Sequence, residues 1–80
     1  MVKVLLLNDD FTPAEFVIHV LQQVFEQSRE TATQLMIATH RDGTGVCGSF
    51  SRDEAVAKVA QARELAKQKG QPLQCTIEQE

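Results

Sequence analysis

Several residue types are scarce or absent in this chain of 80 residues, and each shortage excludes a class of protein. Tryptophan and tyrosine are missing, and cysteine and proline occur only twice each. No apolar run is longer than that of Val4–Leu7, whereas a membrane-spanning helix needs about 20 apolar residues. Met1 is not followed by the basic and then apolar pattern of a signal peptide. We therefore expect a soluble, cytoplasmic chain that does not bind a membrane.

Positive charge is also in short supply. Eight Lys and Arg residues stand against 11 Asp and Glu residues, and no basic run occurs, so the usual source of affinity for nucleic acid is missing. Cys47 and Cys75 lack the CxxC spacing of a zinc knuckle, and one possible disulfide is little support for a small secreted domain. We expect two free thiols in a reducing compartment, no nucleic-acid partner, no metal and no cofactor.

Three segments alternate between apolar and polar residues in the manner of β-strands. They are residues 2–7, 46–50 and 73–78. The first is apolar on most of both faces, which is typical of a central strand, and the last has one apolar and one polar face. Gly48 interrupts the second segment, which predicts a β-bulge or a close backbone approach.

Three further segments have the apolar period of amphipathic helices, and each follows a residue type that caps helix starts. The cap residues are Thr12, Ser28 and Ser51. We expect the first helix to begin at Pro13, with Glu15 completing a capping box, and to end near Gln27. The second helix should end in the turn of residues 41–45, and the third before Gly70.

The element order is therefore β-α-α-β-α-β. A right-handed crossover through the third helix would make the second and third strands parallel, with the first strand antiparallel between them. Eighty residues allow only one small core. We predict a single α+β domain, in which three helices pack on one face of a three-stranded antiparallel sheet.

The densest polar group is Asn8-Asp9-Asp10, in the loop after the first strand. Loops on rigid elements often carry binding sites, but Asx residues are also ordinary turn formers, and a histidine such as His40 at a helix end can simply interact with the helix dipole. Cys47 would need an activating base to act as a nucleophile. The charges on the third helix are by default a solvated face. They are Arg52, Asp53, Lys58, Arg63 and Lys67.

The loop motif has a specific continuation. Leu7-Asn8-Asp9-Asp10-Phe11-Thr12-Pro13 is followed by Glu15-Phe16-Val17-Ile18 and, downstream, by Met36-x-x-x-His40. Later segments add Ala32–Met36, Cys47-Gly48, Phe50, Lys58-Val59, Pro72-Leu73 and Cys75-Thr76. In order and spacing these motifs resemble the ClpS family, the adaptors of the bacterial Clp protease. The resemblance covers residues 1–80 as one adaptor core domain that lacks the family's flexible N-terminal extension, so we expect that this extension is trimmed or that delivery differs.

The resemblance implies an adaptor that catalyses nothing. It would bind N-degrons, which are proteins beginning with Leu, Phe, Tyr or Trp, and hand them to the N-terminal domain of a ClpA-like AAA+ unfoldase. Asn8, Asp9 and His40 would hold the α-ammonium group, and Asp10 would accept hydrogen bonds from the peptide backbone. The side-chain pocket would be formed by Thr12, Pro13, Ala14, Val17, Met36, Thr39 and Leu73. The unfoldase contact is implied at Asp53 and Lys58.

Two positions depart from the family pattern. Ala14 stands where the family usually has a bulky methionine, and Thr39 stands where it usually has an aliphatic residue, so we expect an altered pocket. Two alternatives come from the residues themselves. One is a general interaction module like the C-terminal domain of the ribosomal stalk protein, which has a similar element order. The other is a small enzyme that uses the Cys47 thiol or a metal held by Asp9, Asp10 and His40.

Overall fold

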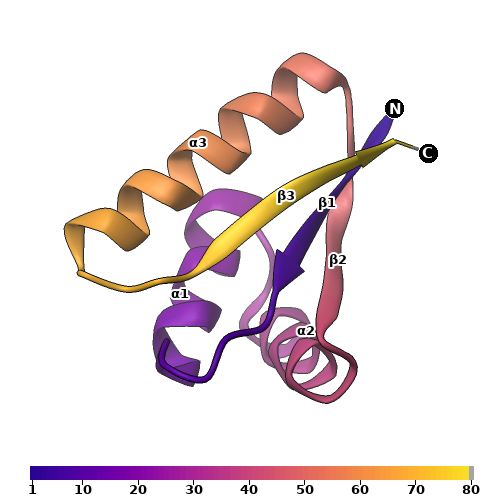
Figure 1. Ribbon diagram of the computed structural model, residues 1–80. Helices are drawn as coiled ribbons and strands as arrows, with labels where there is room; N and C mark the ends of the chain where they lie inside the picture. The colour runs from indigo at the N-terminus through magenta and orange to yellow at the C-terminus, as the bar shows by residue number, and fades with distance from the viewer. Residues whose placement is uncertain (80) are drawn as a thin grey trace.

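The computed structural model describes residues 1–79, which form three helices and three strands in the predicted order (Figure 1). The elements are β1 (Val2–Leu7), α1 (Ala14–Phe25), α2 (Arg29–Asp42), β2 (Thr44–Phe50), α3 (Arg52–Gln68) and β3 (Gln74–Gln79). The strand order is β2-β1-β3, and β1 is antiparallel to both neighbours. The predicted α+β architecture, with the first strand at the centre of an antiparallel sheet, is therefore confirmed.

The core lies between the sheet and the helices, which cover one face of it (Figure 1). On β1, Val2, Val4 and Leu6 are buried, while the residues between them are half-buried. Helix α1 supplies the largest set of buried helical residues. They are Val17, Ile18, Val20, Leu21, Val24 and Phe25. Helix α1 also packs against both other helices, which fix its position relative to the sheet. The β1–α1 loop ends at its first turn.

The start of α1 differs from the prediction. Thr12 does not cap the helix: Pro13 is the N-cap residue, no side chain accepts a cap hydrogen bond, and the helix begins at Ala14. The Thr12 backbone N–H and hydroxyl both donate to the Asp9 carboxylate, at 2.7 and 2.8 Å. These bonds hold Thr12 in the loop turn, one residue before the N-cap position. Helix α1 then ends at Phe25, earlier than expected, since Glu26 takes a left-handed backbone with φ 56°.

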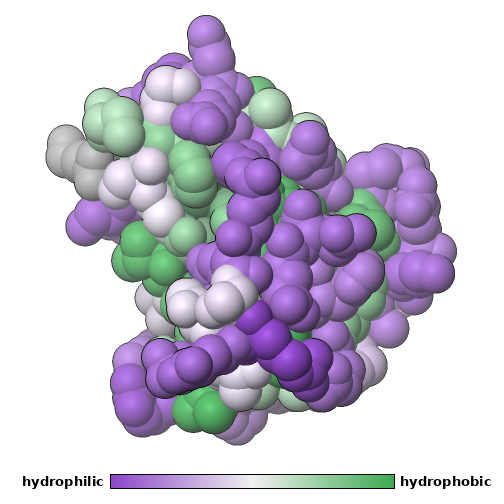
Figure 2. All heavy atoms as spheres, turned by 180° about the vertical axis from the view of Figure 1, so that it is seen from behind, coloured by the Kyte–Doolittle hydropathy of each residue, from purple (hydrophilic) through white to green (hydrophobic). Residues whose placement is uncertain are grey.

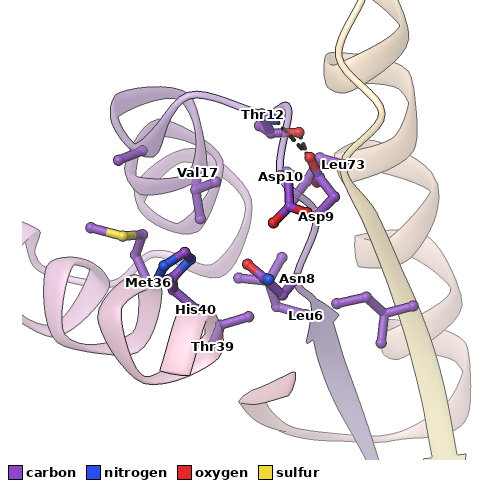
Figure 3. A pocket seen from close by; sticks show the side chains of 12 residues that line it. Leu6, Asn8, Asp9, Asp10, Thr12, Val17, Met36, Thr39, His40 and Leu73 are labelled. Carbon is purple, nitrogen blue, oxygen red and sulfur yellow. Dashed lines mark hydrogen bonds between the residues drawn. The ribbon is translucent and has the colours of Figure 1, made fainter. Parts of the chain in front are cut away.

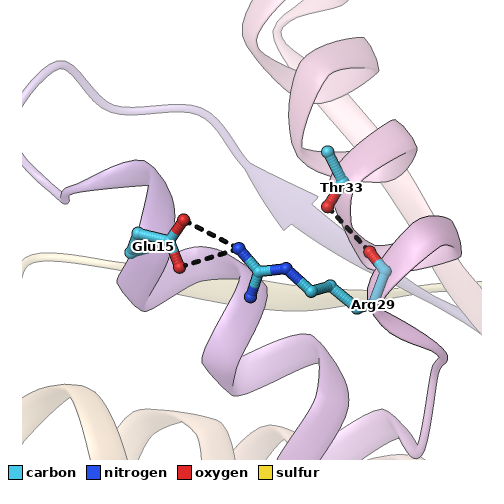
Figure 4. A network of polar contacts seen from close by, with 3 residues as sticks. All are labelled: Glu15, Arg29 and Thr33. Atoms are coloured by element: carbon cyan, nitrogen blue, oxygen red, sulfur yellow. Dashed lines mark hydrogen bonds and ion pairs between the residues drawn. The ribbon is translucent and has the colours of Figure 1, made fainter.

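Glu15 does not complete a capping box either. Its carboxylate accepts hydrogen bonds of 2.9 and 3.2 Å from Nη2 of Arg29 in the first turn of α2, and the Arg29 carbonyl accepts one of 2.7 Å from the Thr33 hydroxyl (Figure 4). The two charged side chains remain 75% and 60% exposed. A pair this exposed contributes less than about 1 kcal/mol, so it orients the two helix starts without holding them together.

The other predicted helix signals are confirmed. The Ser28 side chain accepts a hydrogen bond from the Thr31 N–H at 3.1 Å, and that of Ser51 accepts one from the Glu54 N–H at 3.2 Å. Gly43 ends α2 with a left-handed backbone, φ 91°. Gly70, with φ 65°, follows the end of α3. These signals are local, and α2 and α3 therefore begin and end where the sequence indicates.

Strand β2 contains the predicted bulge. Val4 of β1 pairs with Gly48 and Leu5 pairs with Val46, so Cys47 is the inserted residue. The carbonyl of Cys47 accepts a hydrogen bond of 3.1 Å from the Gln27 side-chain amide. The residue inserted at the bulge is thus also bonded to Gln27, which lies outside the sheet in the α1–α2 connection.

Lys58 is not part of a solvated face, and that expectation was wrong. Its ammonium group donates a hydrogen bond of 2.9 Å to the Val24 carbonyl in the last turn of α1. It also lies 5.4 Å from the ring centre of Phe50 and 6.0 Å from that of Phe25. Helix α1 has no basic residue of its own in its last turn, so Lys58 supplies the positive charge that a helix C-terminus favours.

The surface is mainly hydrophilic in the view of Figure 2, and hydrophobic residues appear there in separate patches. The large hydrophobic residues that are exposed are Met1, Phe11, Ile37, Val46 and Val56, which belong to different elements and loops. Among residues 1–79, no helix has the length and apolar character needed to cross a membrane.

Candidate functional site

Asp9 folds the β1–α1 loop, residues 8–13, back on itself. One carboxylate oxygen accepts hydrogen bonds from the backbone N–H groups of Phe11 at 2.8 Å and Thr12 at 2.7 Å. The other accepts the Thr12 hydroxyl at 2.8 Å. This is an Asx-type turn closed by a second contact. Because Asp9 and Thr12 satisfy each other, the exposed side chains of Asn8 and Asp10 are left available to a ligand.

The same contacts determine the charge of Asp9. Partial burial raises the pKa of its carboxyl group, but the hydrogen bonds from the Thr12 and Phe11 backbones and from the Thr12 hydroxyl outweigh this, and the pKa lies below its ordinary value of 3.8. Asp9 is therefore a carboxylate throughout the neutral range, and the loop carries a fixed negative charge.

We expect Asp9→Ala to lower the free energy of unfolding at pH 7 by about 1 kcal/mol, since it removes several hydrogen bonds from a partly exposed turn. A group with a lowered pKa stabilises the fold above its unfolded pKa and loses this effect as the pH falls through the folded one. The difference from the wild type should therefore shrink below pH 3.8. Urea unfolding at pH 7, 5 and 3 measures it, with Asp10→Ala as a control; a difference independent of pH would contradict the assignment.

The end of α2 is joined to this loop through the backbone. The Asn8 N–H donates to the Gly43 carbonyl at 3.0 Å, and the Gly43 N–H donates to the Thr39 carbonyl at 2.8 Å. Met36, Thr39 and His40 occupy the last two turns of α2. The junction therefore places these three side chains opposite the polar loop.

Between the loop and the helices lies a pocket of about 260 Å³. Its lining residues are Leu6, Leu7, Asn8, Asp9, Asp10, Thr12, Ala14, Val17, Met36, Thr39, His40 and Leu73. Leu6, Val17 and Leu73 are buried and give it an apolar floor. The side chains of Asn8 and Asp10 lie across the pocket from those of His40 and Met36 (Figure 3). The pocket is apolar at its base and rich in hydrogen-bond acceptors at its rim.

The residues that the resemblance assigns to peptide binding line this pocket, with a single exception. Among the described residues, only Pro13 of that set does not line the pocket; it lies at the start of α1, where its carbonyl accepts hydrogen bonds from Phe16 and Val17. Leu6 and Leu7 were missed. The sequence could have indicated them, because they end the strand that leads directly into Asn8.

Two small residues shape the wall. Ala14 is exposed and lies one helical turn before Val17. Thr39 is only 3% exposed, and its hydroxyl donates to the Leu35 carbonyl at 2.8 Å. That bond satisfies the donor and leaves an oxygen lone pair that can accept. Residue 14 therefore adds little bulk to the pocket wall, and the Thr39 hydroxyl lies against Leu35 and Gly45, which do not line the pocket.

The enzymatic alternatives involve the Cys47 thiol and the side chains of Asp9, Asp10 and His40. Cys47 is 7% exposed. Its hydrogen bond with Cys75 and its burial raise the pKa of its thiol, and the same hydrogen bond lowers the pKa of Cys75. Within residues 1–79, no group of three or more His, Cys, Asp or Glu side chains could hold a metal ion. The pocket between the β1–α1 loop and the helices, with its apolar base and polar rim, is suited to binding a ligand.

Asp53 and Lys58, the residues implied in the partner contact, lie outside the pocket lining. Helix α3 begins at the opposite end of the molecule from the β1–α1 loop (Figure 1). Asp53 is exposed in the first turn of α3, while Lys58 is half-buried and engaged with α1. The two residues therefore differ in how free they are to contact a partner.

Comparisons with known proteins give a consistent result. The model of the family "ATP-dependent Clp protease adaptor protein ClpS" matches residues 1–76. The ClpS adapter of Ralstonia pickettii is 57% identical over 79 residues, which cover 99% of this chain and 73% of that protein. That of Burkholderia cenocepacia is also 57% identical over 79 residues, with 99% and 76% covered.

A solved structure is similar to this chain in both fold and sequence. The structure of Agrobacterium tumefaciens ClpS2 bound to L-phenylalaninamide has a TM-score of 0.96 to this chain at 46% identity, and the match covers 99% of this chain and 95% of that one. The family match and the close relatives each span nearly all of the sequence. This chain belongs to the ClpS family of ATP-dependent Clp protease adaptor proteins.

Proposed function

We propose that this chain binds proteins whose first residue has a free amino group and a bulky hydrophobic side chain. It would present these proteins to a Clp AAA+ unfoldase. The observation that carries the proposal is the pocket itself, which combines an apolar floor with a rim of acceptors. A ligand that fits both must have a cationic donor group next to an apolar side chain. The first residue of a protein with an unmodified amino terminus has this combination.

The rim chemistry suits an α-ammonium group. An ammonium ion only donates hydrogen bonds, so it requires acceptors such as a carboxylate, an amide oxygen or a neutral imidazole nitrogen. Asn8 and His40 would accept from it, and Asp9 would add its fixed negative charge. Asp10, which is exposed beside them, would accept from the peptide backbone. L-phenylalaninamide, the ligand named for the Agrobacterium relative, has the same two chemical features.

The expected affinity is moderate. Burial of one Leu or Phe side chain is worth about 1.5–3 kcal/mol, and each charge-assisted hydrogen bond about 1.5–3 kcal/mol. The loss of translational and rotational freedom opposes these gains, which leaves a dissociation constant on the order of micromolar. Such an affinity allows an adaptor to release its cargo.

Fluorescence anisotropy with peptides that differ only in their first residue tests the function. Peptides beginning with Leu, Phe, Tyr or Trp should bind with micromolar dissociation constants, and those beginning with Gly, Asp or Lys at least tenfold more weakly, because they bury little or no apolar surface. The same titration separates this function from a general interaction module. Equal binding of all first residues would contradict the proposal.

Ala14→Met should sharpen the selectivity for the first residue. A methionine at the pocket edge would crowd side chains branched at Cβ, such as Ile and Val, more than Leu or Phe. One or two methylene groups in an apolar pocket are worth about 1–3 kcal/mol, so we expect the Leu:Ile affinity ratio to rise roughly five- to a hundredfold in the variant. Titration of Leu-, Phe-, Ile- and Val-starting peptides measures it. An unchanged ratio would show that residue 14 does not control access.

Asp53→Lys should weaken binding to the unfoldase by roughly fivefold or more while peptide affinity stays the same, since charge complementarity contributes strongly at interfaces. Glu64→Lys is the matched control, because it makes the same charge change on an exposed site of the same helix. Lys58 is unsuitable for such a test, since its reversal would also break the contact with the Val24 carbonyl. Equal losses in the Asp53 and Glu64 variants would argue against a specific contact at Asp53.

A further inference from the structure

A second cavity, of about 600 Å³, adjoins the pocket on the side of α3 and β3. Leu7 and Leu73 line both spaces, so these two residues form the border between them, the Leu7–Leu73 wall. The remaining lining comes from the second half of α3, from the α3–β3 connection and from the start of β3. A peptide whose first residue lies in the pocket would reach this second cavity by crossing the Leu7–Leu73 wall.

The two spaces carry opposite charge. Asp9 and Asp10 line the first pocket, whereas the charged residues that line the second cavity are Arg63 and Lys67. These two lie four residues apart, and therefore on one face of α3, and both are exposed. Neither forms an ion pair with any carboxylate of residues 1–79. In a chain with a net charge of -3, two cations without an ion pair among the described residues thus lie in a hollow beside the acidic rim.

The strand beside this cavity is suited to an extended peptide. Gln74, Cys75 and Thr76 of β3 line the cavity, and β3 lies at the edge of the sheet, paired with β1 alone among the described strands. Edge strands leave backbone N–H and C=O groups available to an added segment. The cavity therefore offers backbone partners as well as positive charge.

We propose that the residues following the first residue of a bound protein enter this second cavity, where Arg63 and Lys67 favour an acidic side chain. The inference rests on the proposed function and adds a preference for the sequence downstream of the first residue. Directly next to the first residue, Asp9 and Asp10 repel a carboxylate. An extended chain advances about 3.3 Å per residue, so the preference arises a few residues further along.

Peptides that begin with Leu and carry one Glu, one Lys or one Gln at a single position from the second to the sixth test this preference. We expect Glu to bind about two- to fivefold more tightly than Gln at one or two positions beyond the second, as for partly solvated ion pairs, and Lys more weakly than Gln. Raising the salt concentration from 0.05 to 0.5 M should remove these differences, because exposed charges are screened.

The double variant Arg63→Gln/Lys67→Gln should lose the preference for Glu and bind the Gln peptides as the wild type does. Arg52→Gln/Lys69→Gln is the matched control, since it removes the same charge from exposed positions outside the cavity lining. Equal binding of Glu and Gln peptides at every position, or a preference that persists in the Arg63/Lys67 variant, would overturn the inference while leaving the proposed function intact. Failure of all Leu-starting peptides to bind, neutral ones included, would overturn both.

Discussion

Acetylation of the amino terminus of a Leu-starting peptide is expected to weaken its binding to this protein roughly tenfold to several hundredfold. The acetyl group removes the positive charge and two N–H donors, whereas the proposed site would use the Asn8 and His40 acceptors and the negative charge of Asp9, all of which line the pocket. Each charge-assisted hydrogen bond is worth about 1.5–3 kcal/mol, and 1.4 kcal/mol corresponds to about a tenfold change in affinity. Matched free and acetylated peptides in an anisotropy titration measure the effect.

Two variants show whether the rim causes this loss. Asn8→Ala should reduce the ratio between free and acetylated peptide, because it removes one acceptor from the rim. Phe11→Ala is the control: it lies in the same loop with its side chain exposed and outside the pocket lining, and only its backbone N–H bonds to Asp9. Equal affinity of the two peptides for the wild-type protein would refute the assignment of an ammonium site.

The variant Gly45→Ala is expected to lose about 1–3 kcal/mol of stability, as overpacked cores do, and to bind peptides more weakly. A Cβ atom at this position would overlap the Thr39 hydroxyl and lie 2.8 Å from the Leu35 side chain. Thr39 cannot turn away freely, because it is buried and its hydroxyl is bonded to the Leu35 carbonyl. The last turns of α2 must therefore move away from β2, and they carry one wall of the pocket.

A double-mutant cycle separates this overlap from other effects. In Gly45→Ala/Thr39→Ala the clashing oxygen is gone, so much of the stability lost in Gly45→Ala should return in urea unfolding. Gly43→Ala is the matched control: its added Cβ would meet no atom within 4 Å, but its φ of 91° strains any L-residue. Thr39→Ala should not rescue it. Losses that simply add for Gly45 and Thr39 would contradict the mechanism.

The fold was predictable where its signals are local. The serines at 28 and 51 cap their helices because a hydroxyl needs only the N–H three residues away. The bulge at Gly48 was indicated by a glycine within a strand pattern. Thr12 carried the same kind of cap signal, and it was wrong because its bonds to Asp9 hold it in the loop while the helix begins one residue later than expected. A sequence pattern lists the acceptors within reach but does not say which one is bonded.

Contacts between elements that are distant in the chain could not be predicted from the sequence. Nothing local shows that Lys58 reaches the end of α1, 34 residues earlier. The pocket residues were named from the family resemblance, and the polar loop alone favoured a simple turn over a binding site. What the structure adds is the junction from Asn8 through Gly43 to Thr39, which brings two segments separated by most of α1 and α2 around one pocket.

The β1–α1 loop divides its tasks between different side chains, and this has an evolutionary consequence. Asp9 and Thr12 keep the loop folded through their mutual hydrogen bonds, whereas Ala14 adds to the wall without a bond that the fold requires. On the proposed function, a substitution at residue 14 would therefore alter which first residues fit without breaking the hydrogen bonds of the loop. Substrate choice in such an adaptor can drift by single replacements at the pocket edge while recognition of the amino terminus is inherited unchanged.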